Sequence, residues 1–483
     1  MKSIILLITL AFALPLFAKS EVDSIIRVSS TLQEHSFGQP WQKGSPYKRR
    51  GLGVLVGKNQ VLTTAEMVAD ANFIQLETVD GIHKLTAKAI AVDYESNLAL
   101  LSVISDEDKA IISKLPAAEL NKPSKLGEQV QIVQVEDNGM PIITNGVFRT
   151  SDMISTFADG HFFLSYEIKA SLQSSSHSYT IPVFKDKKLL GLLTSYDSED
   201  QILNSIAPEI IASFLADAKD GTYAGFPALG IGIKRTTDPH FRSWLKLDAE
   251  KGGVFISRID RNSSAQKAGV KVGDVLLKLD DHPLDRRGYY PDDNYRQLYW
   301  RHLVRGSKKI HDSIKITLLR DGKTIELNAK LERPVEGIIP SHMYGRAPRY
   351  LIKGGIIFTE LSLPYLQLYG ESWESRAPIT LLDAYNNPGD YEKGRKRLVI
   401  ISRIHPTRAT QGYEGIRDDI VNKVNGVKIA DIPSLIKAFE NADKQGIHTI
   451  DIDSSPKKLY LDEAASNEAD KGLKELNIPL SRK

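Results

Sequence analysis

The sequence has 483 residues, which is too many for a single hydrophobic core, so we expect several domains. Its 63 basic side chains nearly balance its 60 acidic ones, so charge gives no support to a nucleic-acid partner or an acidic membrane surface. There are no cysteines, which excludes disulfides, thiol nucleophiles and cysteine metal sites, and the 11 histidines are scattered. We therefore expect no metal and no cofactor.

The N-terminal stretch MKSIILLITLAFALPLFAKS has the pattern of an export signal. Lys2 is followed by a mostly apolar run from Ile4 to Phe17 and by the small residue Ala18, which suits a signal peptidase. The run is short for a membrane helix, and no later stretch approaches the ~20 apolar residues that such a helix needs. We predict a signal peptide over residues 1–18, a chain exported to the periplasm or secreted, and no membrane span after cleavage; an uncleaved anchor is the alternative.

Residues 51–197 have the pattern of many short strands. Runs of β-branched residues are separated by glycine, asparagine and aspartate, and Asp80-Gly81 between two alternating runs is typical of a hairpin turn. Strands at this spacing predict an all-β barrel or sandwich. The next segment, IAPEIIASFLADA from Ile206 to Ala218, predicts a helix.

Two later segments share one order of elements. Residues 252–284 predict a strand, a turn, a short helix, a Gly-Asp turn and a second strand, and a related order recurs over residues 396–429. The amphipathic helix IPSLIKAFENA follows the second copy. Such a repeat predicts two small domains in tandem. The stretch from about Ser454 reads as a polar tail with some helical character, and the aromatic insert from Tyr289 to Gly306 as a local core, a lid or a contact surface.

The segment AQKAGVKVGDVL, from Ala265 to Leu276, matches the pattern A-x-x-A-G-[VIL]-x-x-G-D-x-[IVL] of PDZ domains in the HtrA/Deg family. In this pattern, Gly269 ends the helix with a left-handed residue and Gly273 turns the chain into the next strand. With GFPALGIGI and GYEGIRDDIVNKVNGVKI, the sequence resembles that family, and most of all its plant-type branch and bacterial relatives.

The resemblance implies a mainly β protein in which a trypsin-like double β-barrel is followed by two PDZ-like α+β domains. The implied parts are a signal peptide over 1–18, a trypsin-like, degenerate protease domain over 21–222, a first PDZ domain over 223–334, and a second, divergent PDZ-like domain with a C-terminal tail over 335–483.

The three catalytic motifs of the family are all altered. The first, L-T-x-x-H-V-V-x-x-A, is matched by LTTAEMVADA, which has Glu66 in place of the histidine. The second, D-x-x-x-D-L-A-[VL]-L, is matched by DYESNLALL, which has Asn97 in place of the orienting aspartate. The third, G-N-S-G-G-P, has become SSHSYTIP: counting from the preceding strand places the nucleophile at His177, and counting back from LGL at residues 190–192 places it at Ser178.

These changes remove the chemistry on which the family mechanism depends. A neutral imidazole takes the serine proton in that mechanism, whereas a carboxylate with a reference pKa of about 4 is a far weaker base. Loss of the serine or histidine alone lowers turnover by about 10⁶, and loss of the glycines disturbs the oxyanion hole. We interpret the chain as a pseudoprotease. The alternative is a divergent serine endopeptidase in which Ser178 uses a non-standard base: His177, Lys169, His83 or His161.

The PDZ domains carry the predicted partners. Such domains bind an extended peptide as an added strand, and a backbone loop receives the terminal carboxylate. In the second domain the corresponding segment is Gly354 to Phe358. The resemblance implies binding of unfolded or C-terminal peptides, a possible active protease as partner, a trimer-based homo-oligomer, and work as a scaffold, regulator or chaperone in protein quality control. In the first domain the predicted peptide-binding residues are Leu229, Gly230, Ile231 and Gly232.

Overall fold

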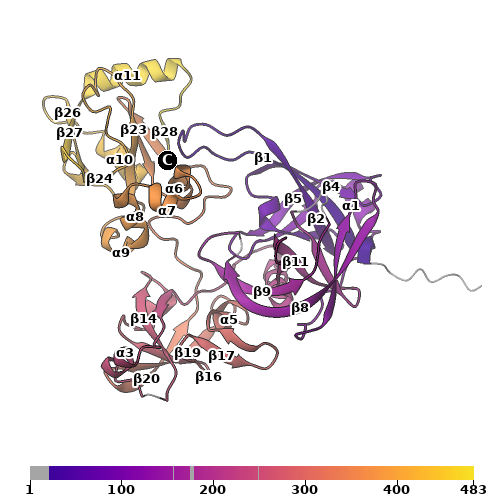
Figure 1. Ribbon diagram of the computed structural model, residues 1–483. Coiled ribbons are helices and arrows are strands. Elements are labelled where there is room, and N and C mark those ends of the chain that lie inside the picture. Colours follow the sequence, from indigo (N-terminus) through magenta and orange to yellow (C-terminus); the bar gives the residue numbers. More distant parts are fainter. Residues whose placement is uncertain (1–20, 156, 174–178, 249) are drawn as a thin grey trace, which may run out of the picture.

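The computed structural model describes residues 21–155, 157–173, 179–248 and 250–483. The chain forms two barrels and two further lobes (Figure 1). The signal peptide predicted over residues 1–18 lies outside the described residues. None of the helices in the described ranges is long and apolar enough to cross a membrane.

The first barrel is closed by six strands that pair in the order β1-β2-β3-β6-β5-β4. The turn predicted at Asp80-Gly81 lies between β4 and β5 and is confirmed. Apolar side chains from all six strands fill the barrel interior, because alternate residues of a strand point to the same face. The strands are β1 (Ile25–Leu32), β2 (Tyr47–Gly57), β3 (Gln60–Thr63), β4 (Ala71–Thr78), β5 (Lys84–Asp93) and β6 (Leu98–Val103).

The second barrel is also closed by six strands, in the order β10-β11-β12-β9-β8-β7. The strands of both barrels pair antiparallel, which confirms the double β-barrel expected for the trypsin-like domain. Its strands are β7 (Gln129–Val135), β8 (Pro141–Ser155), β9 (Phe162–Lys169), β10 (Pro182–Lys185), β11 (Lys188–Asp197) and β12 (Ile202–Ile206).

Two helices accompany the barrels. Helix α1 (Asp106–Ile112) lies between them in the sequence and begins at Ser105, whose side chain accepts a hydrogen bond from a first-turn N–H. Helix α2 (Pro208–Asp217) follows the second barrel, as predicted for this segment. It packs against β11 and buries its apolar face in the core of that barrel.

The first PDZ-like domain contains a sheet in the order β13-β14-β15-β19-β20, so β13 is an edge strand. Gly269 has a φ of 86°, which confirms the left-handed residue predicted after the helix, and Gly273, with a φ of 99°, lies in the predicted turn before β15. The strands are β13 (Ile231–Lys234), β14 (Val254–Ile259), β15 (Val275–Leu279), β16 (His282–Pro283), β17 (Tyr289–Asp292), β18 (Arg296–Tyr299), β19 (Ser313–Arg320) and β20 (Lys323–Lys330). The helices are α3 (Pro239–Trp244), α4 (Ser264–Lys267) and α5 (Arg301–Arg305).

The aromatic insert docks this domain on the second barrel. It forms the hairpin β17–β18 and helix α5, which contact β8 and β9 respectively. Between the two strands of the hairpin, Tyr295 is buried, and its hydroxyl contacts that of Tyr166 at 2.7 Å and also bonds the carboxylate of Glu209. The insert is therefore both local core and contact surface.

The second PDZ-like domain is built on an eight-stranded sheet, with the path β27-β26-β24-β23-β22-β21-β28 and β25 paired to β24. The stretch read as a polar tail contains a helix, as expected, but also completes this sheet with β27 and β28. The strands are β21 (Tyr350–Lys353), β22 (Ile356–Glu360), β23 (Val399–Ile404), β24 (Asp419–Val424), β25 (Val427–Lys428), β26 (Ile447–Ile452), β27 (Lys458–Asp462) and β28 (Ser481–Arg482). The helices are α6 (Leu363–Leu366), α7 (Trp373–Arg376), α8 (Ile379–Asn386), α9 (Pro388–Tyr391), α10 (Ile432–Ala438) and α11 (Glu463–Glu475).

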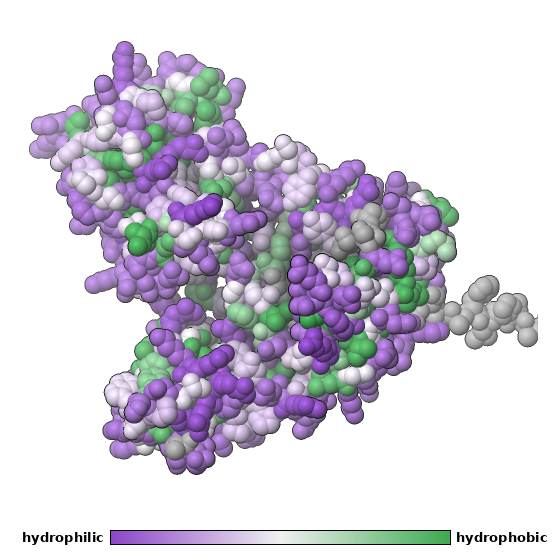
Figure 2. Space-filling model, viewed as in Figure 1, coloured by the Kyte–Doolittle hydropathy of each residue, from purple (hydrophilic) through white to green (hydrophobic). Residues whose placement is uncertain are grey.

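The connection between β1 and β2 reaches the second PDZ-like domain (Figure 1). Arg482 donates a 2.8 Å hydrogen bond to the carbonyl of Pro40, and the ring of Trp41 lies 6.1 Å from that of Tyr350. Figure 2 shows this face of the molecule as largely hydrophilic, with apolar residues in small separate patches. One long loop of the first barrel thus contacts the second PDZ-like domain.

Candidate functional site

Glu66 and Asn97 meet at the rim of the first barrel. Glu66 lies in the short 3-10 helix η2 (Ala65–Met67) directly after β3, and Asn97 lies in the turn before β6. Oδ1 of Asn97 accepts a 2.9 Å hydrogen bond from the backbone N–H of Glu66. The structure therefore brings together the two residues that the motifs place at the histidine and aspartate positions.

Asn97 is buried in a left-handed turn. Its φ of 57° lies in a region that asparagine adopts more readily than most residues. A neutral amide cannot stabilise an imidazolium as aspartate does. The side chain instead binds a backbone N–H that the first turn of η2 leaves without a partner in the helix.

The carboxylate of Glu66 faces Arg49 of β2. Nη1 of Arg49 lies 3.8 Å from Oε1 of Glu66 and donates a 2.6 Å hydrogen bond to the Glu66 carbonyl. Burial raises the pKa of the Glu66 carboxyl, and the positive charge of Arg49 offsets part of this rise. No hydroxyl group of the described residues donates to this carboxylate. The contact is an ion pair, without a nucleophile for Glu66 to activate among those residues.

The ring of Tyr179 also contacts Arg49. The guanidinium carbon lies 4.5 Å from the centroid of the Tyr179 ring, which is a cation–π distance. The two nucleophile candidates, His177 and Ser178, lie outside the described residues. Sequence reasoning missed both Arg49 and Tyr179 as neighbours of the old catalytic position.

Pro182, the first residue of β10, gives a third register for the nucleophile motif. In G-N-S-G-G-P the serine stands three residues before the proline, which assigns its position to Tyr179 and the two following glycines to Thr180 and Ile181. Thr180 and Ile181 are both buried. Pro182 was the signal that could have identified Tyr179. When the motif is aligned on this proline, the side chains of Thr180 and Ile181 stand where the family has two glycines.

Thr180 connects the two barrels beside this position. Its hydroxyl lies 2.6 Å from that of Thr64, and its carbonyl accepts a 3.0 Å hydrogen bond from the N–H of Leu52. Both contacts cross from the second barrel to the first. The segment that follows the nucleophile position is therefore fixed by one backbone hydrogen bond and by one side-chain contact, with Thr64, that a glycine could not make.

Two of the alternative bases have other partners. Nζ of Lys169 donates to the carbonyl of Asp200 on the exposed face of the second barrel. Nδ1 of His161 lies 3.1 Å from Oε2 of Glu95, which also accepts a 2.5 Å hydrogen bond from Arg305 of helix α5. Burial alone would raise the pKa of Glu95, but these two bonds lower it to about 2. His161 therefore takes part in the contact between the first PDZ-like domain and the barrel.

The segment that joins the two PDZ-like domains lies over the rim of the first barrel. The ring of Tyr344 stacks on Phe157 at 4.3 Å and lies 5.2 Å from the ring of Tyr94. The N–H of Gly345 donates a 2.9 Å hydrogen bond to Oδ1 of Asp70. Tyr344 and Asp70 also line a cavity of about 420 Å³ with Arg49. This segment thus covers part of the space next to Glu66.

The structure gives no site for a metal within its described part. No group of three or more histidine, aspartate or glutamate side chains lies there in a position to hold an ion.

The predicted carboxylate loop of the first PDZ-like domain lies at the end of edge strand β13. The carbonyls of Leu229 and Gly230 accept hydrogen bonds of 2.9 Å from the N–H groups of Ala265 and Asp260. Among the described residues, none accepts a hydrogen bond from the N–H groups of Leu229 and Gly230. The carbonyls of this loop thus point into the domain, while its unpaired N–H groups are available as donors. Such a loop is suited to binding an anion.

Gly230 is required by the shape of this loop. Its φ is 74°, and a Cβ atom added there would lie 2.3 Å from Cβ of Ser263. Gly232 lies one residue into β13, so it belongs to the strand that an added peptide would pair with.

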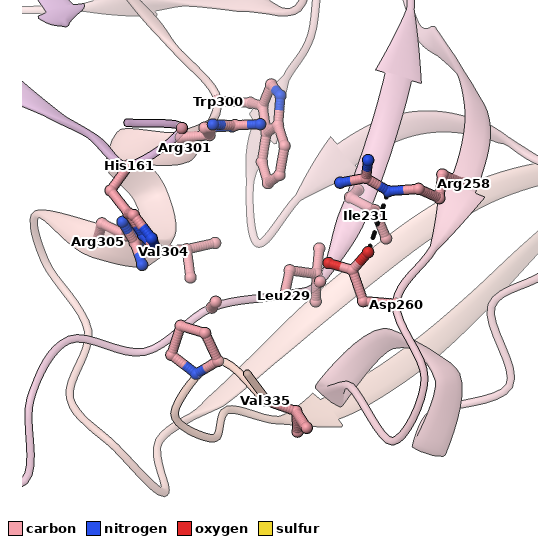
Figure 3. Close-up of a pocket in the computed structure, with 14 residues that line it drawn as sticks. His161, Leu229, Ile231, Arg258, Asp260, Trp300, Arg301, Val304, Arg305 and Val335 are labelled. Carbon is pink, nitrogen blue, oxygen red and sulfur yellow. Dashed lines mark hydrogen bonds and ion pairs between the residues drawn. The ribbon is translucent and has the colours of Figure 1, made fainter. Parts of the chain in front are cut away.

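A pocket of about 230 Å³ opens beside the loop. Figure 3 shows its apolar lining, which comes from the loop and strand on one side and from the α5 segment on the other: Leu229, Ile231, Trp300 and Val304. Polar groups surround this lining: His161, Arg258, Asp260, Arg301 and Arg305. An apolar pocket next to free N–H groups is suited to a peptide end that carries an apolar last residue.

The corresponding loop of the second PDZ-like domain is already filled. The N–H of Gly354 donates a buried 2.7 Å hydrogen bond to Oδ1 of Asp470, a residue of α11. Strand β22 pairs with β21 on one side and with β23 on the other, so it has no free edge for a peptide. An internal carboxylate and an internal strand thus occupy the places that a ligand takes in β-strand addition.

The comparisons with known proteins agree with this architecture. Two family models, each described as a PDZ domain, match residues 227–331 and 339–482. The chain is 26% identical to Protease Do-like 2, chloroplastic, of Arabidopsis thaliana over 86% of this chain and 67% of that protein. It is also 26% identical to Protease Do-like 4, mitochondrial, of the same plant, over 94% of this chain and 84% of that protein.

A solved structure supports the fold. A variant of the HtrA-type protease AlgW with a decapeptide superposes with a TM-score of 0.51 at 18% identity, covering 65% of this chain and 95% of that one. At this level of identity the likeness concerns the fold alone.

Replacement of Asn97 tests its contact with the Glu66 N–H. We expect Asn97→Ala to lower the free energy of unfolding by about 2 kcal/mol, because a partly buried N–H loses its acceptor and alanine resists the left-handed turn. Asn97→Gly should lose about 1 kcal/mol less, since glycine adopts this φ freely. Urea unfolding measures both. If each variant loses less than about 0.5 kcal/mol in the free energy of unfolding, a structural role for Asn97 is contradicted.

Replacement of Glu66 tests its burial. Folding raises the pKa of this carboxyl above the ordinary value of 4.5, so its ionisation lowers the free energy of unfolding as pH rises through that range. Glu66→Gln should therefore be more stable than the wild type at pH 7, and the difference should vanish below pH 4.5. Thermal unfolding from pH 4 to pH 8 measures this, with the exposed Glu107→Gln as control. A variant less stable at pH 7 would contradict the prediction.

Proposed function

Because the chain belongs to the HtrA/Deg family, we propose that it is a member that binds peptides through its first PDZ domain and does not hydrolyse them. The observation that carries the proposal is the state of the old catalytic positions. Glu66 is paired with Arg49, and Asn97 uses its side-chain oxygen on the backbone. Neither residue can take up and return a proton as a histidine with its aspartate does.

The oxyanion hole also supports loss of hydrolysis. A tetrahedral intermediate is stabilised by backbone N–H groups in a turn that glycines form. In the register set by Pro182, Thr180 and Ile181 stand in the glycine positions, and Thr180 is fixed by contacts with Thr64 and Leu52. A rigid, substituted turn lowers the residual activity that the family retains when only the triad is lost.

One observation favours the alternative, a divergent serine endopeptidase. Burial raises the pKa of Glu66, and a carboxylate with a raised pKa is a better base than an exposed one. In this alternative Ser178 would be the nucleophile. Glu66 would first have to leave Arg49, which lies 3.8 Å from its carboxylate.

Peptide binding is assigned to the first PDZ domain because its groove is open. Strand β13 has a free edge, and the N–H groups of Leu229 and Gly230 have no acceptor in the described chain. The second PDZ domain lacks both features, since Asp470 and β21 fill them. We expect the first domain to bind the free C-terminal ends of unfolded or processed proteins, with a small apolar last residue in the pocket.

The wider role follows from peptide binding without cleavage. The chain would act as a scaffold, a regulator of an active protease partner, or a chaperone in protein quality control. Export to the periplasm or beyond, cleavage after Ala18 and assembly into trimer-based oligomers stay predictions of the sequence and its resemblance.

A cleavage assay tests the loss of hydrolysis. Purified chain incubated with unfolded casein should release no more peptide than buffer alone, because Glu66 is paired with Arg49 and Asn97 binds the backbone. The Ser178→Ala variant should behave as the wild type does. Cleavage that the wild type performs and Ser178→Ala loses would establish the endopeptidase alternative.

A matched pair of glycine variants tests the peptide site. Gly230→Ala should weaken binding of a C-terminal peptide at least about tenfold, because the added methyl group would collide with Ser263 in the carboxylate loop. Gly269→Ala also adds a methyl group at a positive φ, but it has open space around it and lies outside the pocket, so binding should be unchanged. Fluorescence anisotropy measures both. Equal affinities for the two variants would place binding elsewhere.

A further inference from the structure

Two pockets adjoin along the free edge of β13. The first lies at the carboxylate loop, and the second, of about 290 Å³, lies further along the strand beside Ile233. The second pocket takes part of its wall from the barrel, through Asp152 and Phe162. Arg301 is the arginine that lines both pockets, so it stands at the point where a bound peptide would pass from one to the other.

Arg301 differs from the other arginines of the first pocket and from Arg287 of the second. Each of those has a carboxylate partner: Arg258 with Asp260 at 3.0 Å, Arg305 with Glu95 at 2.5 Å, and Arg287 with Asp285 at 2.9 Å. The guanidinium of Arg301 instead stacks over the ring of Phe162 at 4.8 Å and approaches Trp300 at 5.8 Å. Within the described ranges it makes no ion pair and no hydrogen bond through its side chain.

This arrangement leaves a partly buried positive charge without an ion-pair contact among the described residues. Burial lowers the pKa of Arg301, and the nearby charges of Arg305 and Arg258 act in the same direction. Tyr299 and Asp260 oppose this shift. An unpaired charge that is removed from water has a free-energy cost, which an anionic group of a ligand would relieve. The aromatic faces also hold the guanidinium in one orientation, so less side-chain entropy is lost when an anion binds.

Strand geometry gives the position of that anion in a peptide. A ligand added to β13 places every second side chain on the same face, and two residues of a strand advance about 6.6 Å. On α5, Arg301 and Arg305 are four residues apart, which is about 6 Å along a helix. If the last side chain of the peptide lies beside Val304 and Arg305, the side chain two residues earlier lies beside Arg301.

We propose that the first PDZ domain selects peptides with two anions, a free C-terminal carboxylate at the Leu229–Ile231 loop and an acidic side chain two residues earlier at Arg301. The inference rests on the proposed peptide-binding function and adds the class of ligand. The apolar pocket between the anions favours a small aliphatic last residue. On the far wall Asp152 accepts a 3.3 Å hydrogen bond from the Tyr289 hydroxyl, and its negative charge disfavours an acidic residue beyond this point.

Two labelled decapeptides test the selection on the full chain. One ends in glutamate, alanine and valine, and the other has glutamine in place of that glutamate. The glutamate peptide should bind about tenfold more tightly, because a charged group paired with a guanidinium gains more than a neutral amide does. The difference should shrink as salt is raised. Fluorescence anisotropy at two ionic strengths measures both effects.

Variants of Arg301 assign the effect to this residue. Arg301→Gln should lower affinity for the glutamate peptide to that of the glutamine peptide, without changing the latter. Arg301→Lys should keep most of the preference, and Arg301→Glu should reverse it toward a peptide with lysine at that position. The matched control is Arg235→Gln, which removes an exposed charge from the second pocket and should keep the preference. Thermal unfolding confirms that each variant is folded.

The outcomes separate this inference from the function on which it rests. Equal binding of the glutamate and glutamine peptides, with loss of binding when the C-terminus is amidated, would overturn the role of Arg301 and leave the carboxylate loop standing. Binding of amidated and free peptides with the same affinity would overturn the proposed peptide site itself. A preference that persists in Arg301→Gln and disappears in Arg235→Gln would assign the anion to Arg235 and overturn the inference.

Discussion

The docking of Tyr295 on the second barrel is the contact on which the peptide groove depends. One buried hydroxyl bonds both Tyr166 and Glu209, and the ring lies near Phe148 in the core that the barrel and the first PDZ domain share. Because this contact fixes the hairpin β17–β18, it also fixes the start of α5. The groove would otherwise lose the wall that the barrel supplies through Phe162.

The old catalytic positions have each acquired a structural partner. Asn97 holds the backbone of η2, Glu66 pairs with Arg49, and Thr180 links the barrels through Thr64. Each of these contacts uses a group that a working protease would need free or differently charged. The double barrel is therefore present with these positions in structural contacts, which is the basis of the proposed loss of proton transfer.

Much of the fold and part of the site could be predicted from the sequence. Local sequence signals sufficed where one residue decides the backbone geometry, as at Gly269. The motifs assigned Glu66 and Asn97 to the histidine and aspartate positions, and the structure shows that the two residues are in contact. Arg49 could not be found this way, since its position beside Glu66 depends on how β2 lies in the closed barrel.

Two other features escaped sequence reasoning for different physical reasons. The alignment of Tyr179 with the nucleophile position was missed because counting residues from the strand before the altered loop and from the strand after it gives different positions. Pro182 belongs to the motif itself and gives the count directly. The polar stretch that contains Asp470 gave little hydrophobic signal, because α11 contributes mainly a carboxylate and small side chains to its contact with the Gly354 loop. Polar contacts between distant segments leave no period in a sequence.

The turn between β5 and β6 belongs to two domains at once. Asp93 accepts a hydrogen bond from Tyr223 at the entry to the first PDZ domain, Glu95 binds Arg305, and Asn97 supports η2. Alternate residues of one short segment therefore anchor the domain boundary, the helix beside the groove and the barrel rim. The acidic side chains of this segment therefore hold the domains together, a role that does not depend on whether the barrels cut a peptide bond.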